Sequence, residues 1–343
     1  MSDTAANILD GAVHPAANTQ LFGHADALNF LARSYRTAKS HHAILIEGPE
    51  GIGKATLAFR FANYVLSNPE PGLAPVTIPD PDPSTPISRQ ILSGASHNLL
   101  HLTRPVDDKT GKVKSAITVD EVRRAGRFFS QTSGTGNRRI VIIDPADDLN
   151  RNAANAILKI LEEPPRGAMF LVLSHAPGKL LPTIRSRCQT LKLSPLGDDE
   201  LAGALKALGQ SLDGGQTEEA VRTLAKGSVA RALKLKNYGG LDIIAAFDEI
   251  VTGEGPSARK AMHRLADVLS GKDSEVIFTF FLEHLSEYLV EQARQAARQG
   301  QLAIADRRAK LVSEIVEKIT VSTAYNLDKK QTLLSILEAA KAA

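Results

Sequence analysis

The chain has 343 residues, of which 43% are hydrophobic and 23% charged, the balance of an ordinary soluble protein with two or three domains. Its net charge of only +3 gives no overall excess that would demand a nucleic-acid partner, so any such surface must come from local clustering. A single cysteine excludes an internal disulfide and a multi-cysteine zinc site, and it suits a reducing compartment.

Neither a targeting segment nor a membrane span is visible in the sequence. The first twenty residues carry no basic start and no apolar run. No stretch approaches the about eighteen uninterrupted apolar residues that a membrane span needs. We therefore expect a cytoplasmic protein that is neither secreted nor embedded in a membrane.

The first strong pattern is a strand, a glycine-rich turn and a helix between residues 42 and 66. "HAILIEG" is a short apolar run that ends in glycine, and "KATLAFRFANYVL" places apolar residues on one helical face. In a phosphate-binding loop, glycines let backbone N–H groups turn toward the phosphates and a lysine neutralises their charge. The residues that fit these roles are Gly48, Gly51, Gly53 and Lys54. The pattern predicts phosphate-loop ancestry.

The position after the lysine departs from this pattern. Ala55 stands where phosphate loops carry a serine or threonine hydroxyl for magnesium. Thr56 comes next, but one residue along a helix rotates a side chain by about 100°. Ancestry therefore does not imply activity.

Two segments between the loop helix and the next strand differ in composition from the rest. Residues 68–86 hold seven of the chain's 17 prolines, and we expect an extended, mobile insertion there. Residues 101–139 hold nine Lys and Arg against four acids, and a helix is expected over 119–129. Arg123 and Arg124, near the start of that helix, are candidate DNA contacts; the alternative is a solvated surface.

Alternating strands and helices then predict the fold class. The apolar runs 139–144 ("RIVIID") and 169–174 ("MFLVLS") have the length and β-branched content of strands buried on both faces. Between them "NAANAILKILEEPP" repeats apolar residues at helical spacing, and Pro164 with Pro165 stops the helix. The pattern predicts an α/β fold with a parallel sheet covered on both sides.

Polar residues at the ends of these strands are candidates for a nucleotide site. Asp144 is correctly placed for a metal-binding aspartate, but Pro145 follows it and can abstract no proton from water. Asp147 is expected to cap the helix that begins near Asn150. Ser174 ends the strand 169–174, where a serine commonly terminates a strand. Hydrolysis at this chain's own loop is therefore not expected.

An arginine pair precedes the last predicted strand, 189–193. Arginine fingers act from another surface, often another subunit, by stabilising charge on a transferring phosphate. Arg187 is the candidate for this role, with Arg185 close by. The alternative for either is an exposed or salt-bridging arginine. Cys188 is expected to behave as a small buried hydrophobe.

After Pro195 the strand signals cease and the rest of the chain has helical patterns. We expect three parts: a phosphate-loop domain over 1–195, a small helical domain over 196–238 and a longer helical domain over 239–343. In the last part, an apolar stripe between Ile277 and Leu289 predicts a packed helix face.

Taken together, three motifs resemble one family. The segment 21–66, the run "NAANAILKILEEPP" and the triplet within "TIRSRC" look like the delta-prime subunits of bacterial DNA polymerase III clamp loaders. The resemblance covers roughly residues 16–236, and the remainder is compatible by its helical character only. It implies an AAA+ phosphate-loop domain, a small helical lid and an all-α collar that joins five subunits into an open ring.

The family resemblance also implies roles for this chain. It implies a largely catalytically silent subunit that supplies Arg187 to the ATP site of an adjacent motor subunit. The implied partners are motor and delta subunits in a hetero-pentamer, primed DNA and the sliding clamp. Ser174 is implied at the position of a polar nucleotide sensor. No cofactor is required; weak binding of ATP or ADP stays open because Lys54 is retained.

The sequence departs from the family pattern in two further places. Many relatives carry a four-cysteine zinc module where this chain has the proline-rich insertion, so no zinc is expected. Active relatives carry a nucleotide-contacting arginine on the lid, where "GSVARALKL" places Ala230 with Arg231 beside it. Two enzyme hypotheses remain as alternatives: an active ATP-hydrolysing motor subunit of the same loader, and a phosphate-loop kinase for small nucleotides. The kinase leaves the helical C-terminal third unexplained.

Overall fold

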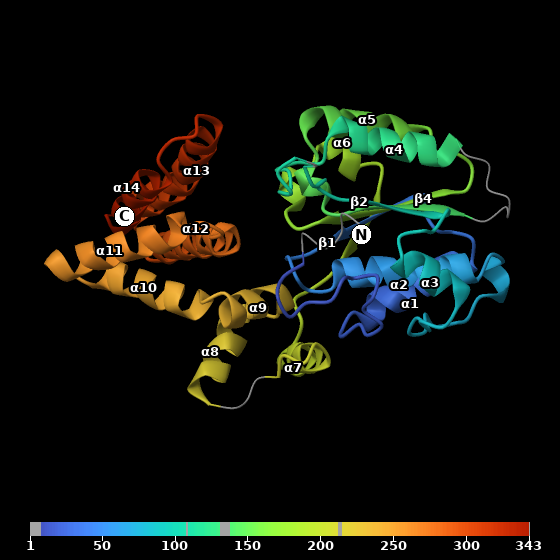
Figure 1. The fold of residues 1–343 in the computed structure, drawn as a ribbon, viewed down its shortest axis with the longest axis horizontal. Coiled ribbons are helices and arrows are strands. Elements are labelled where there is room, and N and C mark those ends of the chain that lie inside the picture. Colours follow the sequence, from blue (N-terminus) through green and yellow to red (C-terminus); the bar gives the residue numbers. More distant parts are fainter. Residues whose placement is uncertain (1–7, 108, 131–137, 212–214, 343) are drawn as a thin grey trace. The chain divides into compact units, whose positions relative to one another are not determined.

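The computed structural model describes residues 8–107, 109–130, 138–211 and 215–342. The chain forms two compact units, Met1–Ala230 and Arg231–Ala343 (Figure 1). No helix in the described part is both long and apolar enough to cross a bilayer. The three-part division predicted at residues 195 and 238 remains a prediction.

The first unit is built around a five-stranded parallel sheet in the order β2-β3-β4-β1-β5. The strands are β1 (Ala43–Glu47), β2 (Leu99–Leu102), β3 (Arg139–Ile143), β4 (Ala168–Ser174) and β5 (Gln189–Lys192). The end of β1 is central: Glu47 is in register with Ser174 of β4 and with Lys192 of β5. The predicted parallel sheet is confirmed. Sequence analysis missed β2, a four-residue strand that is only partly buried.

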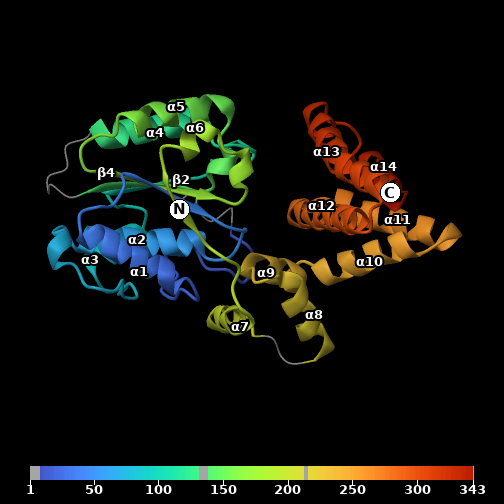
Figure 2. The ribbon, with the colours of Figure 1, turned by 180° about the vertical axis from the view of Figure 1, so that it is seen from behind.

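Helices cover both faces of this sheet (Figures 1 and 2). One layer contains α1 (Ala25–Arg36), α2 (Lys54–Ser67) and α3 (Pro86–Leu92), and the other contains α4 (Val119–Ser130), α5 (Arg151–Glu162) and α6 (Pro182–Arg185). Because strand side chains alternate, Ile44 and Ile46 join the core under α1 and α2, while Ala43 and Leu45 join the core under α4 and α5. The predicted α/β class, covered on both sides, is confirmed.

The proline-rich insertion differs from the expectation of an extended, mobile segment, which was wrong. It contains a short 3₁₀ turn, Pro71–Leu73, and buries Ala74 and Ile78 in the core beneath α2. Its backbone is also anchored, because the hydroxyl of Tyr64 donates to the carbonyl of Pro75 at 2.6 Å. Side chains of neighbouring helices therefore hold a segment whose composition alone indicated flexibility.

Helices form the remainder of the described chain. The segment that follows β5 contains α7 (Asp198–Ala207), α8 (Gln216–Ala225) and α9 (Val229–Asn237). The second unit then contains α10 (Gly240–Thr252), α11 (Gly255–Ser270), α12 (Glu275–Arg298), α13 (Leu302–Ala324) and α14 (Lys329–Lys341). Phe247, Phe280 and Phe281 are fully buried in this unit. The apolar stripe predicted on α12 is thus confirmed as a core face.

Candidate functional site

The predicted phosphate loop connects β1 to α2 at the carboxyl edge of the sheet. Gly51 and Gly53 have φ angles of 74° and 102°, in a region that side chains other than glycine rarely adopt. α2 begins at Lys54, so its N-terminus follows the loop directly, as phosphate binding requires. His24 contacts the carbonyl oxygen of Ile52 through Nε2 at 2.7 Å. The backbone frame of a phosphate loop is therefore present.

Lys54 is turned into this loop. Its Nζ donates to the carbonyl oxygens of Gly48 and Pro49, at 2.6 Å and 2.5 Å, and the residue is only 3% exposed. Burial lowers the pKa of the amine from its ordinary value of 10.5 to about 8, against the opposing effect of nearby acids, Asp144 first. The group that should neutralise phosphate is bonded to its own chain.

The start of α9 closes over the same loop. The N–H of Val229 donates to the carbonyl of Gly51 at 2.9 Å, and the hydroxyl of Ser228 donates to the carbonyl of Glu50 at 2.7 Å. A Cβ on Gly51 would come within 2.3 Å of the Cβ of Ala230. The loop and the lid segment are therefore in direct contact, with no space between them for another side chain.

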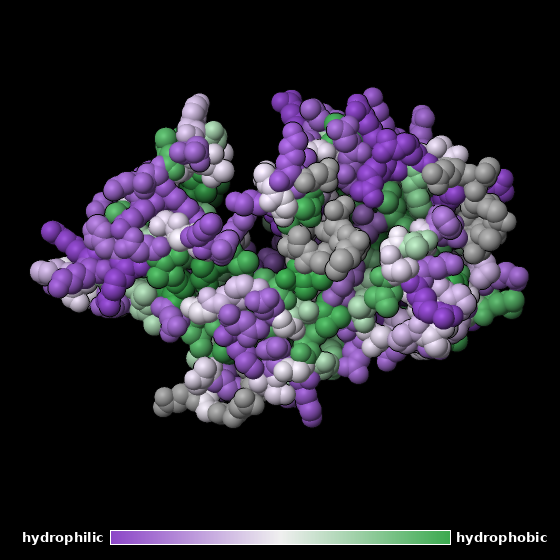
Figure 3. Space-filling view, in the orientation of Figure 1, coloured by the Kyte–Doolittle hydropathy of each residue, from purple (hydrophilic) through white to green (hydrophobic). Residues whose placement is uncertain are grey.

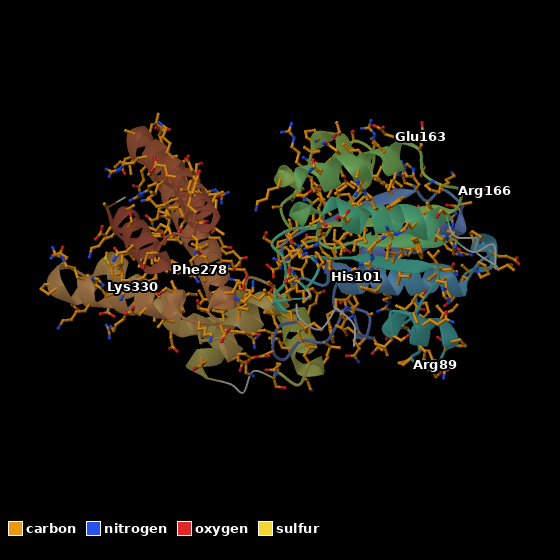
Figure 4. All side chains as sticks on the ribbon, turned by 45° about the horizontal axis from the view of Figure 1, so that its top comes forward. Arg89, His101, Glu163, Arg166, Phe278 and Lys330 are labelled. Carbon is orange, nitrogen blue, oxygen red and sulfur yellow. The ribbon has the colours of Figure 1, made fainter. Side chains whose placement is uncertain are left out.

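The residues expected to hold magnesium do not fit that ion. Ala55 offers no oxygen, and Thr56 is buried on α2. Asp144 lies at the end of β3, with Oδ2 3.5 Å from Nε2 of His101, a residue of β2 (Figure 4). Burial opposes the charged form of Asp144, but His101, His175 and Lys54 outweigh it and hold the pKa of this carboxyl below its ordinary value. Among the described residues, no group of three or more His, Cys, Asp or Glu side chains could hold a metal ion.

Asp147 does not cap the following helix, so that prediction was wrong. Asn150 is the N-cap of α5 and accepts from the N–H of Ala153 at 2.8 Å. Asp147 instead accepts from the hydroxyl of Ser174 at 2.8 Å and from the N–H of His175 at 2.5 Å. It cross-links the segments that follow β3 and β4. Ser174 is fully buried, and its place as a nucleotide sensor remains a prediction.

Arg187 lies just after α6, in a segment separate from the phosphate loop. Its Nη2 lies 2.6 Å from Oε1 of Glu162, and its Nη1 donates to the carbonyl of Thr183 at 2.9 Å. The side chain is 34% exposed. Arg185 is different: its Nε lies 3.7 Å from Oε1 of Glu47, a carboxylate at the end of β1 whose side chain is 5% exposed. The two arginines therefore differ in their partners: Arg185, although 46% exposed, pairs with a buried carboxylate, whereas Arg187 pairs with an exposed one.

Cys188 follows Arg187 and is partly buried against the core under α4 and α5. Burial raises the pKa of its thiol from 9.0 to about 12. A thiol with such a pKa is almost entirely protonated at neutral pH and is a poor nucleophile. The side chain packs against the core, but it is only partly buried, whereas the sequence predicted a buried residue.

Arg123 and Arg124, the candidate DNA contacts, lie on α4. Arg123 pairs with Asp120 at 2.8 Å, and Arg124 pairs with Glu121 at 2.5 Å, each pair spaced three residues apart on the helix. Both arginines remain substantially exposed. The surface over α4 and α5 is largely hydrophilic (Figure 3). Their role in DNA binding remains a prediction.

Sequence reasoning missed three contributors to these sites. Ser228 bonds to a loop residue 178 positions away, a contact that no local pattern indicates. His101 could have been suspected only once β2 was known to be a strand ending beside β3. Glu162 was visible as part of the "LEEPP" helix end, but nothing in the sequence linked it to Arg187.

Arg231, which follows Ala230 in the sequence, pairs with Glu287 at 3.0 Å within the second unit.

The parallel sheet, the loop after β1 and the polar strand ends define a phosphate-loop type of α/β domain. The chain belongs to the family described as "DNA polymerase III, delta subunit", whose sequence model matches residues 23–197. The delta' subunit of DNA polymerase III from Pseudomonas aeruginosa is 35% identical over 204 residues, 59% of this chain and 58% of that protein. The delta' subunit from Bacillus subtilis is 34% identical over 169 residues, 49% of this chain and 47% of that protein.

Other members of the polymerase also match. The gamma subunit from Buchnera aphidicola is 28% identical over 227 residues, 65% of this chain and 58% of that protein. The chain thus spans less than two thirds of the curated relatives described here. A solved gamma subunit-related protein from Thermotoga maritima aligns over 91% of this chain and 98% of that one, at 17% identity and a TM-score of 0.43.

Proposed function

We propose that the chain is a delta-prime type of clamp-loader subunit that does not hydrolyse ATP at its own loop. The observation that carries this proposal is the state of Lys54, whose amine is buried and bonded to the carbonyls of Gly48 and Pro49. Ala55 supports it, because no hydroxyl is available for magnesium at that position. Nucleotide would have to break the contacts of Lys54 and displace the lid segment at Ser228.

The second half of the proposal is a function in trans. Arg187 supplies its guanidinium to the ATP site of a neighbouring motor subunit, where positive charge stabilises the transferring phosphate. Two features support this role. The guanidinium is partly exposed, and its position after α6 is fixed by a backbone carbonyl and a carboxylate rather than by burial.

The proposed partners follow the family. The chain would assemble with motor and delta subunits in a hetero-pentamer in the cytoplasm and help load the sliding clamp onto primed DNA. A loader must act at any sequence, so contact with DNA should be made mainly with phosphates and should weaken as salt rises. Arg123 and Arg124 are the proposed contacts on this chain.

The test is co-purification with candidate clamp-loader subunits, followed by ATPase assays with and without this chain. The isolated chain should show no DNA-stimulated turnover, whereas the assembled complex should hydrolyse ATP faster when the chain is present. Arg187→Ala should leave folding and assembly intact and should lower turnover at the adjacent motor site by about 10³-fold or more.

Two results would contradict the proposal. Robust turnover by the isolated chain would favour the alternative of an active motor subunit. Unchanged hydrolysis by a fully assembled Arg187→Ala complex would remove the arginine from the mechanism.

A further inference from the structure

The "LEEPP" sequence ends α5 at a defined residue. Pro164 cannot continue a helix, and the residue before a proline is driven away from helical backbone angles. Glu163 accordingly leaves the helix, with φ −123° and ψ 72°, and Glu162 becomes the last residue of α5. The double proline thus fixes where the carboxylate of Glu162 lies.

Glu162 stands at an unfavourable place for a helix. Carbonyl groups at a helix C-terminus carry partial negative charge, which disfavours an acidic side chain there. The carboxylate of Glu162 therefore does not stabilise α5 from this position. What it contacts is the guanidinium of Arg187, with Nη2 at 2.6 Å from Oε1.

This contact orients the guanidinium without enclosing it. A guanidinium has five N–H donors in one plane. Nη1 donates to the carbonyl of Thr183 at 2.9 Å, and Nη2 forms an ion pair with Oε1 of Glu162 at 2.6 Å. The remaining N–H groups make no hydrogen bond to any residue in the described part of the chain. These two contacts, together with the covalent attachment of the group through Nε, restrict the orientation of the guanidinium and leave other N–H groups for an anion from outside.

We propose that Glu162 is the positioning residue for Arg187. The carboxylate holds the plane of the guanidinium so that its remaining N–H groups face the phosphate of an adjacent motor subunit. This inference rests on the proposed function in trans. Both side chains are partly exposed, 34% for Arg187 and 47% for Glu162. A partly exposed pair of this kind contributes little to stability, so its loss should change the reaction more clearly than the fold.

Glu163 provides a matched control for charge and position. It is the next residue and is exposed, and no described base lies within ion-pairing distance of its carboxylate. Figure 4 labels it where α5 ends. Removing the charge of Glu163 changes the local electrostatics in nearly the same way as removing the charge of Glu162, but it leaves the contact between Glu162 and Arg187 intact.

The experiment uses the assembled clamp-loader complex and measures kcat and KM for ATP. Glu162→Gln should lower the kcat that depends on Arg187 by about three- to fivefold, with little change in KM, because the arginine acts on the transition state. Glu162→Asp should recover part of this loss, and Glu163→Gln should behave like the wild type. In an Arg187→Ala complex, Glu162→Gln should have no further effect.

The outcomes separate the two proposals. If Arg187→Ala leaves hydrolysis unchanged, the function in trans fails and this inference fails with it. If Arg187→Ala abolishes the stimulation but Glu162→Gln leaves kcat unchanged or raises it, only the inference fails. An equal loss from Glu162→Gln in the Arg187→Ala background would show a structural role and would also overturn it.

Discussion

Lys54 and Arg187 lie in the same domain, and their environments are opposite. The amine of Lys54 is 3% exposed and bonded to two carbonyl oxygens of its own loop. The guanidinium of Arg187 is 34% exposed and held by only two contacts. Both residues belong to motifs that normally act on phosphate. Of these two side chains, only the arginine is exposed enough to donate to another molecule.

The difference teaches that the frame of a phosphate loop can be present while the polar groups of the loop bond to one another. The strand order, the glycine turn and the N-terminus of α2 are all in place. What has changed is the use of a few polar groups. The loop carbonyls accept from Lys54, Ser228 and Val229, so the closed arrangement is stabilised by hydrogen bonds.

The largest expected effect tests the closure of the loop. Gly51→Ala should destabilise the first unit by about 3–5 kcal/mol, because a positive φ is strained for alanine and the new Cβ would meet Ala230. Gly94→Ala is the matched control: its φ is also positive, at 68°, but open space surrounds it. It should lose only about 1 kcal/mol. Urea unfolding of both variants would measure the difference, and equal losses would show that the lid does not confine the loop.

A smaller effect should separate the two arginines. Arg185→Ala leaves the buried carboxylate of Glu47 without its ion pair and should cost about 2 kcal/mol, reduced from the value for a fully buried pair because Arg185 is half-exposed. Arg187→Ala should cost less than about 1 kcal/mol. Thermal unfolding would show which of the two variants is less stable. If Arg187→Ala lowers the stability more than Arg185→Ala does, the proposed contrast between the two arginines is wrong.

A further test concerns the pH dependence of stability at Lys54. The folded chain releases the amine proton near pH 8, whereas the unfolded chain holds it until about 10.5. The unfolded state binds more protons in this window, so the wild type should gain stability as pH rises from 8 to 10.5, by about 3 kcal/mol. Lys54→Met lacks this gain.

Denaturant unfolding at several pH values should therefore show the free energy of unfolding of the wild type improving relative to Lys54→Met across this range. The relative stability should be constant below pH 8, where both states of the wild type carry the charge. If the difference in free energy of unfolding between the wild type and Lys54→Met does not change with pH, the amine of Lys54 is exposed to solvent.

The sequence was sufficient for the fold because strong local patterns set it. The runs 139–144 and 169–174 became β3 and β4, and the two prolines ended α5 where they were expected to. Ala55 and Pro145 were likewise visible as losses. What could not be predicted depends on long-range geometry: the destination of Asp147, the packing of the insertion and the contact between Glu162 and Arg187. These side chains make their contacts with segments that local periodicity does not connect to them.

The contact between Gly51 and Ala230 couples the phosphate loop to a segment far away along the chain. A side chain added at position 51 would meet Ala230, and the carbonyl of Gly51 accepts from the N–H of Val229. A substitution that reshapes the loop would therefore require a matching change at the start of α9.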